Sequence, residues 1–506
     1  MGQWSTSQRN EVITIGTIQI EQLSFQYDGQ LAPIFNRVDL QLDASWKLGL
    51  VGRNGRGKTT LFRILQNQLQ YQGKIRTDLE FQYFPQTVEK PEESVWLVIR
   101  CVTGLEDYDQ WQILIELDKL GLPESILAEP FNQLSPGQQT KILLASLFVG
   151  EGKFQLIDEP TNHLDEAGRQ VISDYLRQKS GFILISHDRY FLNAIIDHVI
   201  SIDRAKISQF KENYRTWDEE NTARNNWELN EKEKLQRDIK RLESASQKKT
   251  GWANQTEAKV SSAVDRGFIS HKSAKSMKRA LSIKKRANKA VEEKQSLLKN
   301  IDVAEPLTLN FERISSEKSL LEVIDFSALR KEVTVNHPVS FKVKSTERLV
   351  IQGENGSGKS SVISAILGHL DYQGQRQLAA PLKVSWLPQD FDGLSGSLQD
   401  FAAEKAVSYS LLLDMLRKLG FERDEFMKDI SQMSMGQKRK VALSRSLVEP
   451  ANLYIWDEPL NYLDVITRQQ IQDVIMTFQP PMLIIDHDKE FVESVGTKFI
   501  EIKRRI

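Results

Sequence analysis

The chain has 506 residues, of which 40% are hydrophobic and 27% charged, and its formal net charge is −1. This length predicts two or three domains with cores of their own. No apolar run approaches the roughly 18 residues that a membrane-spanning helix requires, which argues against an integral membrane protein. The single cysteine, Cys101, excludes an internal disulfide framework and favours a reducing, cytoplasmic location.

The first informative stretch is rich in glycine. An apolar segment at Trp46–Val51 predicts a buried strand, and Thr59–Leu69 predicts an amphipathic helix. Between them, residues 52–59 read Gly-Arg-Asn-Gly-Arg-Gly-Lys-Thr, which is a complete P-loop. Its glycines let backbone N–H groups surround phosphate oxygens, Lys58 supplies a charge to the β- and γ-phosphates, and Thr59 offers a hydroxyl to Mg²⁺.

A second group of polar residues ends an apolar segment about 100 residues further on. Phe154–Ile157 predicts a strand, and two carboxylates, Asp158 and Glu159, follow it. In an open α/β sheet, the carboxyl ends of the strands border the ligand crevice. We therefore expect Asp158 to hold the Mg²⁺ shell, directly or through water, and Glu159 to polarise the attacking water. Ser135 precedes a predicted helix over residues 139–148 and is also suited to be an ordinary N-cap.

Together these motifs resemble those of ATP-binding-cassette ATPases. Ser135–Gln138 resembles the signature motif, Asp158–Asp165 the Walker B motif with the D-loop, and Phe84–Gln86 the Q-loop. The resemblance implies that Tyr27 stacks on adenine and that His187 is the switch histidine. A lone histidine is more often structural, but a position behind a predicted strand and beyond the Walker B motif favours the switch role.

The same motifs recur in the same order in the second half of the chain. Adding 301 to the first P-loop gives a second P-loop at residues 353–360 without a gap. The distance from the P-loop lysine to the Walker B aspartate is 100 residues in the first copy and 98 in the second. This repetition indicates an internal duplication. The expected fold is therefore α/β, with two tandem nucleotide-binding domains of the ATP-binding-cassette type.

The resemblance implies two ATP sites with Mg²⁺ and assigns residues to them by position. The expected catalytic pairs are Glu159 with His187 and Glu458 with His487. The expected Mg²⁺ ligands, most of which also border the nucleotide, are Thr59, Gln86, Asp158, Ser360, Gln389 and Asp457. The remaining expected ATP contacts of the first copy are Tyr27, Gly52, Asn54, Gly55, Gly57, Lys58, Thr60, Ser135, Gly137, Gln138 and Asp165. Those of the second copy are Gly353, Asn355, Gly356, Gly358, Lys359, Ser361, Ser434, Gly436, Gln437 and Asp464.

The two copies differ close to these sites. Ala328 stands at the position of Tyr27, so adenine stacking in the second site depends on whether Phe326 reaches the base. At three further positions the first copy has Thr161, His163 and Ser186, and the second copy has Leu460, Tyr462 and Asp486. Both carboxylates and both histidines are retained, so we expect both sites to hydrolyse ATP, at unequal rates. In the family each P-loop closes on the opposite signature, which implies a monomer whose two domains pair around ATP and part after hydrolysis.

Between the copies lies a basic segment. Residues 211–301 carry 22 Lys and Arg against 13 Asp and Glu, and Arg266–Val291 holds nine basic residues and no acid. Apolar residues at helical spacing on both sides of a loop around Thr250–His271 predict a helical hairpin. A run of charged residues is usually a solvated linker, but a basic excess of this size suggests a polyanionic partner. The aromatic residues in the loop of the hairpin either pack against one another or contact folded RNA. The candidate contacts are Trp252, Phe268, Lys272, Lys275, Lys278, Arg279, Lys284, Lys285 and Arg286.

Two fused domains without a membrane span, joined by a basic helical linker, resemble the ABC-F family, which works on ribosomes. The long linker, the sequence Pro459–Asp464 and the stretch Gly267–Lys272 resemble its antibiotic-resistance branch, which protects ribosomes from lincosamides, streptogramin A and pleuromutilins. This resemblance implies binding to 23S rRNA and to tRNA in the exit-site region, with displacement of drugs from the peptidyl-transferase region. The P-loop lysine and the signature serine are only 77 and 75 residues apart, which leaves no room for the arm that translation factors of the family often carry.

The expected division of the chain is a tail at residues 1–15, domains at 16–211 and 303–506, and the linker at 212–302. The closest alternative function is a housekeeping translation factor of the same family, acting on stalled ribosomes. The ATPase subunit of a drug exporter would need separate membrane partners, and a DNA-repair ATPase would usually carry zinc-binding cysteines.

Overall fold

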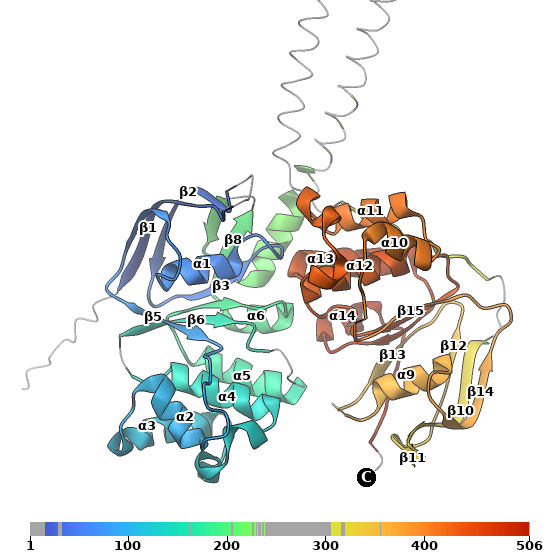
Figure 1. The fold of residues 1–506 in the computed structure, drawn as a ribbon, viewed down its shortest axis with the longest axis horizontal. Helices are drawn as coiled ribbons and strands as arrows, with labels where there is room; N and C mark the ends of the chain where they lie inside the picture. Colours follow the sequence, from blue (N-terminus) through green and yellow to red (C-terminus); the bar gives the residue numbers. More distant parts are fainter. Residues whose placement is uncertain are drawn as a thin grey trace, which may run out of the picture. The chain divides into compact units, whose positions relative to one another are not determined.

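The computed structural model divides into two units. The first consists of Met1–Trp217 together with Pro306–Ile506, and the second of Asp218–Glu305. It describes residues 16–28, 33–150, 152–161, 164, 166–203, 206–224, 227–228, 230, 234, 237, 305–314, 319–354, 356–391 and 393–504. The first unit holds both copies of the repeated motifs (Figure 1). The tail at 1–15 and most of the expected linker, including all of residues 238–302, lie outside the described residues, together with the candidates Trp252, Phe268, Lys272, Lys275, Lys278, Arg279, Lys284, Lys285 and Arg286.

A parallel sheet forms the centre of the first copy. Its strands lie in the order β5 (Glu80–Phe84), β6 (Lys153–Asp158), β7 (Phe182–Ile185), β3 (Lys47–Val51), β8 (His198–Asp203) and β9 (Lys206–Phe210). All neighbours are parallel except β8 and β9. Every residue of β7 is buried, as expected for a strand covered on both faces. Because β5, β6 and β7 end at one edge, the segments after Phe84, Asp158 and Ile185 come together there.

A smaller antiparallel sheet packs beside it, in the order β2 (Phe35–Asp43), β1 (Thr17–Phe25) and β4 (Gln72–Arg76). Buried Ile18, Ile20 and Leu23 join the hydrophobic core that β3, β6 and β7 line from one side. The helices of this copy are α1 (Lys58–Leu65), α2 (Val95–Thr103), α3 (Gln110–Lys119), α4 (Pro136–Leu147), α5 (Glu166–Arg177) and α6 (Arg189–Ile195). Short 3₁₀ turns at η1 (Asp107–Asp109), η2 (Glu124–Ala128) and η3 (Phe131–Gln133) connect α2, α3 and α4.

The second copy repeats this plan (Figure 1). Its parallel sheet has the order β15 (Val384–Leu387), β16 (Leu453–Asp457), β17 (Met482–Ile485), β13 (Arg348–Gln352) and β18 (Lys498–Glu501). Its antiparallel sheet contains β11 (Val333–Thr334), β10 (Ser319–Arg330), β12 (Val339–Lys344) and β14 (Tyr372–Leu378). Its helices are α9 (Lys359–Leu367), α10 (Leu398–Glu404), α11 (Tyr409–Lys418), α12 (Met435–Val448), α13 (Val465–Phe478) and α14 (Lys489–Val495), with turns at η4 (Arg423–Met427) and η5 (Ile430–Gln432).

The predicted α/β fold with two tandem domains is confirmed, and the ends of two predicted helices differ. The helix after the first P-loop spans Lys58–Leu65 rather than Thr59–Leu69, because the backbone turns left-handed at Asn67, where φ is 57°. The helix after the signature begins at Pro136 rather than at residue 139. Proline is tolerated in a first helical turn, where its missing N–H costs no hydrogen bond.

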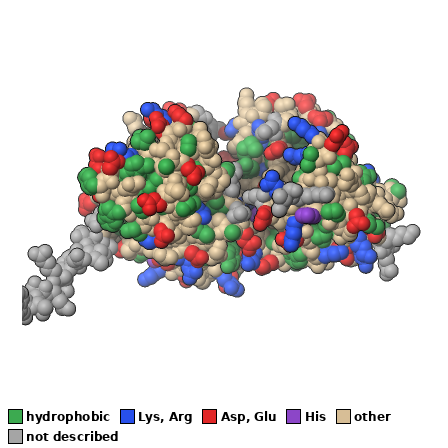
Figure 2. Space-filling model, turned by 90° about the horizontal axis from the view of Figure 1, so that it is seen from below, with side chains coloured by type: hydrophobic (Ala, Val, Ile, Leu, Met, Phe, Trp, Pro, Cys, Tyr) green, Lys and Arg blue, Asp and Glu red, His purple; other side chains and the backbone are tan. Residues whose placement is uncertain are grey.

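None of the helices in the described part of the chain is both long enough and apolar enough to cross a membrane. Figure 2 shows acidic and basic side chains interspersed over one face of the molecule. Neither sign of charge dominates that face.

Candidate active site

The first P-loop connects β3 to α1, and its backbone conformation requires glycine. At Gly57 φ is 99°, and a Cβ atom there would lie 2.4 Å from Cγ2 of Ile34. At Gly52 a Cβ atom would lie 2.8 Å from the carbonyl oxygen of Ile202. Only glycine fits such positions without displacing the neighbouring strand. The loop therefore presents backbone N–H groups at the start of α1, where the helix dipole favours an anion.

Both P-loop lysines point into their own loops. The Nζ of Lys58 donates to the carbonyl oxygen of Gly52 at 2.7 Å and to Oδ1 of Asn54 at 3.2 Å. The Nζ of Lys359 donates in the same way to the carbonyl oxygens of Gly353 at 2.8 Å and Glu354 at 2.9 Å. Burial lowers the pKa of Lys58, while nearby carboxylates oppose this effect. A phosphate inside the loop would supply the counter-charge that the buried ammonium group needs.

The oxygen atoms expected to bind Mg²⁺ lie beside the first P-loop. Thr59 Oγ1 donates to Asp158 Oδ2 at 3.2 Å, and Tyr83 Oη donates to the same carboxylate oxygen at 3.2 Å. Gln86 Oε1 is buried and accepts no hydrogen bond from the described residues. Hydroxyl, carboxylate and amide oxygens are the ligands that Mg²⁺ prefers, so this set fits the ion. Bound there, Mg²⁺ would neutralise phosphate charge and stabilise the ionised form of nearby carboxyl groups.

The second copy has the same arrangement. Ser360 forms a side-chain hydrogen bond to Asp457. Asp457 Oδ1 is buried and, within the described residues, has no hydrogen-bond partner. Burial, with Glu458 acting in the same direction, raises the pKa of Asp457 to about 6. A carboxyl group with an unpaired oxygen and a raised pKa lies in a position that a cation would stabilise.

Both candidate bases, Glu159 and Glu458, adopt an unusual backbone conformation. Their φ angles are 52° and 49°, in the left-handed region that residues other than glycine seldom occupy. Each is held there by the neighbouring strand, because its N–H donates to the carbonyl oxygen of Ile185 at 2.9 Å or of Ile485 at 2.7 Å. Residues in strained conformations of this kind gather at active sites, where the surrounding structure maintains them.

The two histidines expected to be switch residues lie near these carboxylates. His187 Nε2 is 3.3 Å from Glu159 Oε1, and His487 Nε2 is 3.8 Å from Glu458 Oε1. Burial, reinforced by the charge on Asp158, raises the pKa of Glu159 to about 8. Burial, reinforced by Lys58 and by Arg468 from the other copy, brings the pKa of His187 well below its usual value. The backbone N–H of His187 donates to Glu159 Oε2 at 3.4 Å, whereas Glu159 Oε1 has no hydrogen-bond partner within the described residues. A cation near Asp158 would favour the carboxylate form that a base requires.

The first P-loop also contacts the second copy. Asn54 N donates to Asp464 Oδ2 at 3.1 Å, and Asn54 Nδ2 donates to the carbonyl oxygen of Tyr462 at 2.9 Å. The same amide nitrogen lies 3.5 Å from the position of a Cβ atom on Gly436, in the signature of the second copy. Asp464 is fully buried, and Lys440 Nζ lies 3.4 Å from its Oδ2 atom. The structure thus brings the first P-loop, the second D-loop and the second signature into one site. In the opposite site the equivalent residues, Asn355 and Asp165, lie outside the described residues.

A family model described as ABC transporter matches residues 35–162 and 336–461, which together make up half of the chain. The chain belongs to the ABC transporter family. It contains the ABC domain twice and is an ATPase, and ABC domains in general bind ATP together with Mg²⁺.

Several relatives match almost the whole chain. The ribosome protection protein VmlR of Bacillus subtilis is 26% identical over 493 residues, which cover 96% of this chain and 85% of VmlR. The ATP-binding protein Uup of Caulobacter vibrioides is 26% identical over 489 residues, covering 93% of this chain and 75% of Uup. A solved complex of an archaeal ribosomal stalk protein with the archaeal ribosome recycling factor aABCE1 has a TM-score of 0.58 at 17% identity. That alignment covers 95% of this chain and 87% of the solved chain, and it supports the ABC fold alone.

The two ABC domains differ where adenine is expected. Tyr27 is half-buried, with its Oη atom 3.2 Å from Thr60 Oγ1, so its ring stands beside the first turn of α1. In the second domain Ala328 is fully buried, and so is Phe326, whose ring stacks on Tyr372 at a centroid distance of 4.9 Å. Phe326 therefore belongs to the core and does not replace Tyr27 as an aromatic surface for adenine.

The signature serines act as helix caps in both ABC domains. Ser135 accepts a hydrogen bond from the N–H of Gln138, whose side chain accepts one from the N–H of Ser135. Ser434 and Gln437 form the same capping box at α12. The N-cap role and the proposed role toward phosphate are compatible, because a capped helix N-terminus directs its remaining N–H groups outward.

Some residues at the ABC domain contact were missed by reasoning from the sequence. Arg169 Nη1 lies 3.5 Å from Asp188 Oδ2 and also donates to the carbonyl oxygen of His487, in the other domain, at 3.1 Å. Arg468 pairs in the same way with Asp488 at 3.0 Å. Both arginines follow the D-loop aspartate by four residues, and this repeated position was the sequence feature that could have identified them.

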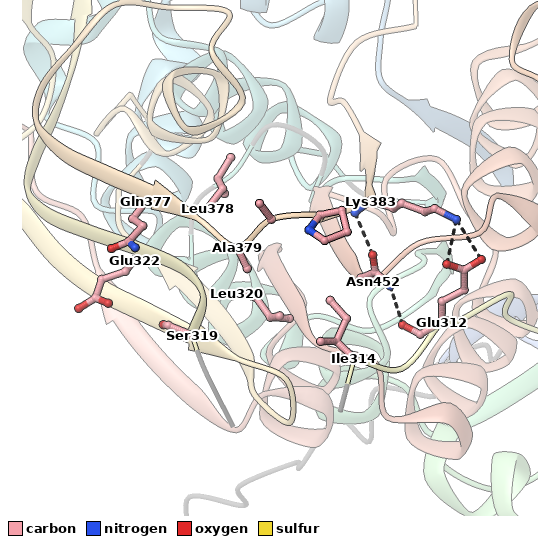
Figure 3. Close-up of a pocket in the computed structure, with 12 residues that line it drawn as sticks. Glu312, Ile314, Ser319, Leu320, Glu322, Gln377, Leu378, Ala379, Lys383 and Asn452 are labelled. Atoms are coloured by element: carbon pink, nitrogen blue, oxygen red, sulfur yellow. Dashed lines mark hydrogen bonds and ion pairs between the residues drawn. The ribbon is translucent and has the colours of Figure 1, made fainter. Parts of the chain in front are cut away.

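A cavity of about 950 Å³ lies in the second domain, lined by residues of β10 and β14 and by Glu312, Lys383 and Asn452 (Figure 3). Three of its polar residues bond to one another: Lys383 Nζ is 3.0 Å from Glu312 Oε2, and Asn452 Oδ1 accepts from the N–H of Lys383 at 2.9 Å. None of its lining residues belongs to the P-loop, Q-loop, signature, Walker B or switch segments. We therefore place the ATP chemistry at the strand ends and not in this cavity.

Proposed function

We propose that the protein is an ABC-F ATPase that binds the ribosome and protects it by displacing antibiotics from the peptidyl-transferase centre. The drug classes are lincosamides, pleuromutilins and streptogramin A. The observation that carries the proposal is the contact of Asn54 with Asp464 and Tyr462, which joins two ABC domains of one chain around an ATP site. ATP binding closes such a pair, and hydrolysis lets it open.

Within each site we propose the following division of work. Glu159 and Glu458 activate water, and His187 and His487 hold these carboxylates and sense the γ-phosphate. The oxygen ligands described above hold Mg²⁺, and the P-loop lysines bind phosphate. This assignment is supported by the hydrogen bond from the N–H of His187 to Glu159 Oε2 and by the strained conformation shared by both glutamates.

The ribosomal part of the proposal is supported by charge and by kinship. Residues 266–291 carry nine basic side chains and no acid in a chain whose net charge is −1, which suits an RNA backbone. VmlR, which matches 96% of this chain, is named a ribosome protection protein. Uup and YdiF, which match at 26% and 24% identity, are named only as ATP-binding proteins, so a housekeeping translation factor is the second candidate.

Ribosome co-sedimentation tests the closing step. Glu159→Gln combined with Glu458→Gln keeps the shape of both sites, but an amide cannot act as a base, so turnover should be nearly abolished while ATP still binds. The closed protein should then accumulate on ribosomes in the presence of ATP. Glu124→Gln, on an exposed turn, is the matched control and should behave like the wild type. Equal ribosome occupancy for the wild type and the double variant would contradict the proposal.

Drug susceptibility in a sensitive host separates the two candidate functions. A ribosome protection protein should raise resistance to the three drug classes and leave resistance to decoding-site drugs unchanged. A housekeeping factor should change neither, although it would still co-sediment with ribosomes.

A further inference from the structure

Arg439 in α12 is fully buried and forms hydrogen bonds to backbone carbonyl groups in the loops of the second ATP site. Its Nη1 atom donates to the carbonyl oxygen of Pro388 at 2.8 Å, and its Nε atom donates to that of Pro459 at 3.2 Å. Its Nη2 atom donates to the carbonyl oxygen of Asp457 at 2.8 Å and to that of Glu458. One guanidinium group therefore joins the Q-loop to the Walker B segment, including the backbone of the candidate base.

The same side chain confines Gln389 from both sides. Pro388, just before Gln389, accepts the hydrogen bond described above, and the guanidinium carbon lies 4.5 Å from the ring centroid of Phe391, two residues after it. Phe391 is itself only 3% exposed. The Q-loop glutamine is thus held in a short segment that Arg439 fixes to Glu458.

The first ABC domain lacks this device. Thr140 stands at the position of Arg439, is only half-buried, and donates within its own helix to the carbonyl oxygen of Pro136 at 2.9 Å. The neighbouring positions change together with it. Thr161 and Ser186, whose hydroxyl oxygens are 3.5 Å apart, are replaced by Leu460 and Asp486, where the N–H of Leu460 donates to Asp486 Oδ2 at 3.2 Å.

These exchanges belong together electrostatically. A buried guanidinium group is costly unless negative charge lies nearby. Asp486 is the acidic group that most strongly favours the charged form of Arg439, and Arg468 also offsets the buried charge of Asp486. The second domain therefore has a buried arginine and a buried aspartate where the first has threonine and serine, and burial raises the pKa of that aspartate to about 6.

The helix that carries Arg439 also faces the first ATP site. Ser434 caps α12, and Gly436, in its first turn, lies against Asn54 of the first P-loop. Arg439 follows one turn later. An α-helix transmits displacement as a rigid element. A displacement of α12 that accompanies nucleotide binding in the first site must therefore move the guanidinium group of Arg439 and the loops of the second site that are bonded to it.

We propose that Arg439 is a positioning residue that couples the two ATP sites. Closure of the second signature on a nucleotide at the first P-loop sets Gln389 and Glu458 in place at the second site, so nucleotide in the first site strengthens nucleotide binding in the second. Coupling of binding is reciprocal, so nucleotide in the second site strengthens binding in the first by the same factor. This inference concerns ATP binding alone and does not depend on the proposed role at the ribosome.

The test measures nucleotide binding in each half of the full chain. Photolabelling with 8-azido-ATP in the Glu159→Gln, Glu458→Gln protein is followed by cyanogen bromide cleavage. Cleavage after Met277 separates the first domain, in residues 2–277, from the second P-loop, in residues 278–415. Label in the fragment 278–415 then reports occupancy of the second site at each nucleotide concentration.

Loss of nucleotide from the first site should weaken nucleotide binding at the second site. Lys58→Ala should raise the half-saturating nucleotide concentration of the second site by about fivefold or more, a factor typical of coupled sites. A second protein carries the residues of the first domain at three positions (Arg439→Thr, Leu460→Thr and Asp486→Ser). In this protein Lys58→Ala should shift the half-saturating nucleotide concentration of the second site less than about twofold. An equal shift in both proteins would overturn the proposal.

Two further variants separate positioning from folding. Arg348→Thr removes another buried arginine, which donates to the carbonyl oxygen of Val495 at 2.6 Å, so it should lower stability and leave the coupling intact. Arg439→Lys keeps the charge without the planar fork, so the coupling should still be lost. Full coupling in Arg439→Lys, or loss of coupling in Arg348→Thr, would show that the geometry of Arg439 is not the cause.

Discussion

At the scale of single residues, the two sites share the groups proposed to be catalytic and differ in the groups around them. The two glutamates and two histidines occupy matching positions, with Nε2–Oε1 distances of 3.3 Å and 3.8 Å. Around them, Tyr27 has no aromatic counterpart at the second site, and Arg439 has none at the first. Unequal sites are therefore expected from neighbouring residues and not from the loss of a catalytic group.

Tyr27→Ala should weaken nucleotide binding at the first site. Stacking of aromatic rings adds about 0.5–1.5 kcal/mol beyond burial, so affinity should fall roughly two- to tenfold. Tyr27→Phe retains the ring and should bind nearly normally, although it loses the contact between Tyr27 Oη and Thr60 Oγ1. Ala328→Gly at the second site is the matched control. Titration with a fluorescent ATP analogue would measure the affinities, and equal values for all variants would show that adenine is held by other residues.

At the scale of elements, ion pairs fasten the helical part of the first domain to α5. Glu116 on α3 accepts hydrogen bonds from Tyr175 on α5 and from Lys179, and it lies 2.9 Å from Lys119 Nζ. Desolvation raises the pKa of Glu116, but these hydrogen bonds outweigh it, so the pKa is lowered overall. The carboxylate form of Glu116 therefore stabilises the folded domain.

Glu116→Gln should lower the free energy of unfolding by about 1–3 kcal/mol at neutral pH, as for the loss of a charged partner in a buried network. A group with a lowered folded pKa contributes stability above its unfolded pKa of about 4.3, and this contribution is lost as pH falls through the folded value. The difference between the variant and the wild type should accordingly shrink on acidification. Thermal unfolding from pH 7 down to pH 3 would measure it, and a constant difference would mean that the charge of Glu116 has no role.

How much the sequence predicts depends on the range of the interaction. The P-loop, the strands that lead into it and the tandem arrangement follow from local patterns of glycine and apolar residues. Arg439 could not be placed from the sequence, because a basic residue beside a signature motif reads as solvent-exposed, whereas four backbone carbonyl groups receive it. The contact between Asn54 and Asp464 spans 410 residues, so only the family resemblance could indicate it.

At the scale of the whole molecule, the charge is divided between the basic segment and the rest of the chain. Residues 266–291 carry nine basic side chains, and the face in Figure 2 shows mixed charge. An RNA-binding surface confined to one segment should dominate the salt dependence of ribosome binding.

Charge reversal at Lys284, Lys285 and Arg286 should weaken ribosome binding and flatten its dependence on salt. Each lost phosphate contact removes about 0.7–0.9 from the slope of log K against log salt, so three contacts should remove roughly two to three. Reversal of three exposed lysines of the ABC domains, Lys74, Lys90 and Lys428, is the control and should leave the slope unchanged. Sedimentation at several salt concentrations measures the slope, and equal slopes for all three proteins would make residues 284–286 a solvated linker.

The left-handed backbone at Glu159 and Glu458 sets activity against stability at these two positions. Glycine adopts a φ near 50° without steric strain, whereas this left-handed conformation costs any other residue about 1–2 kcal/mol of conformational free energy. Glu159→Gly should therefore unfold at a higher temperature than Glu159→Ala, although both lack the carboxylate that we propose as the base. A lineage selected for robustness alone would drift toward glycine at these sites. The presence of glutamate at both means that the chain keeps a strained backbone at each of the two carboxylates that we propose as bases.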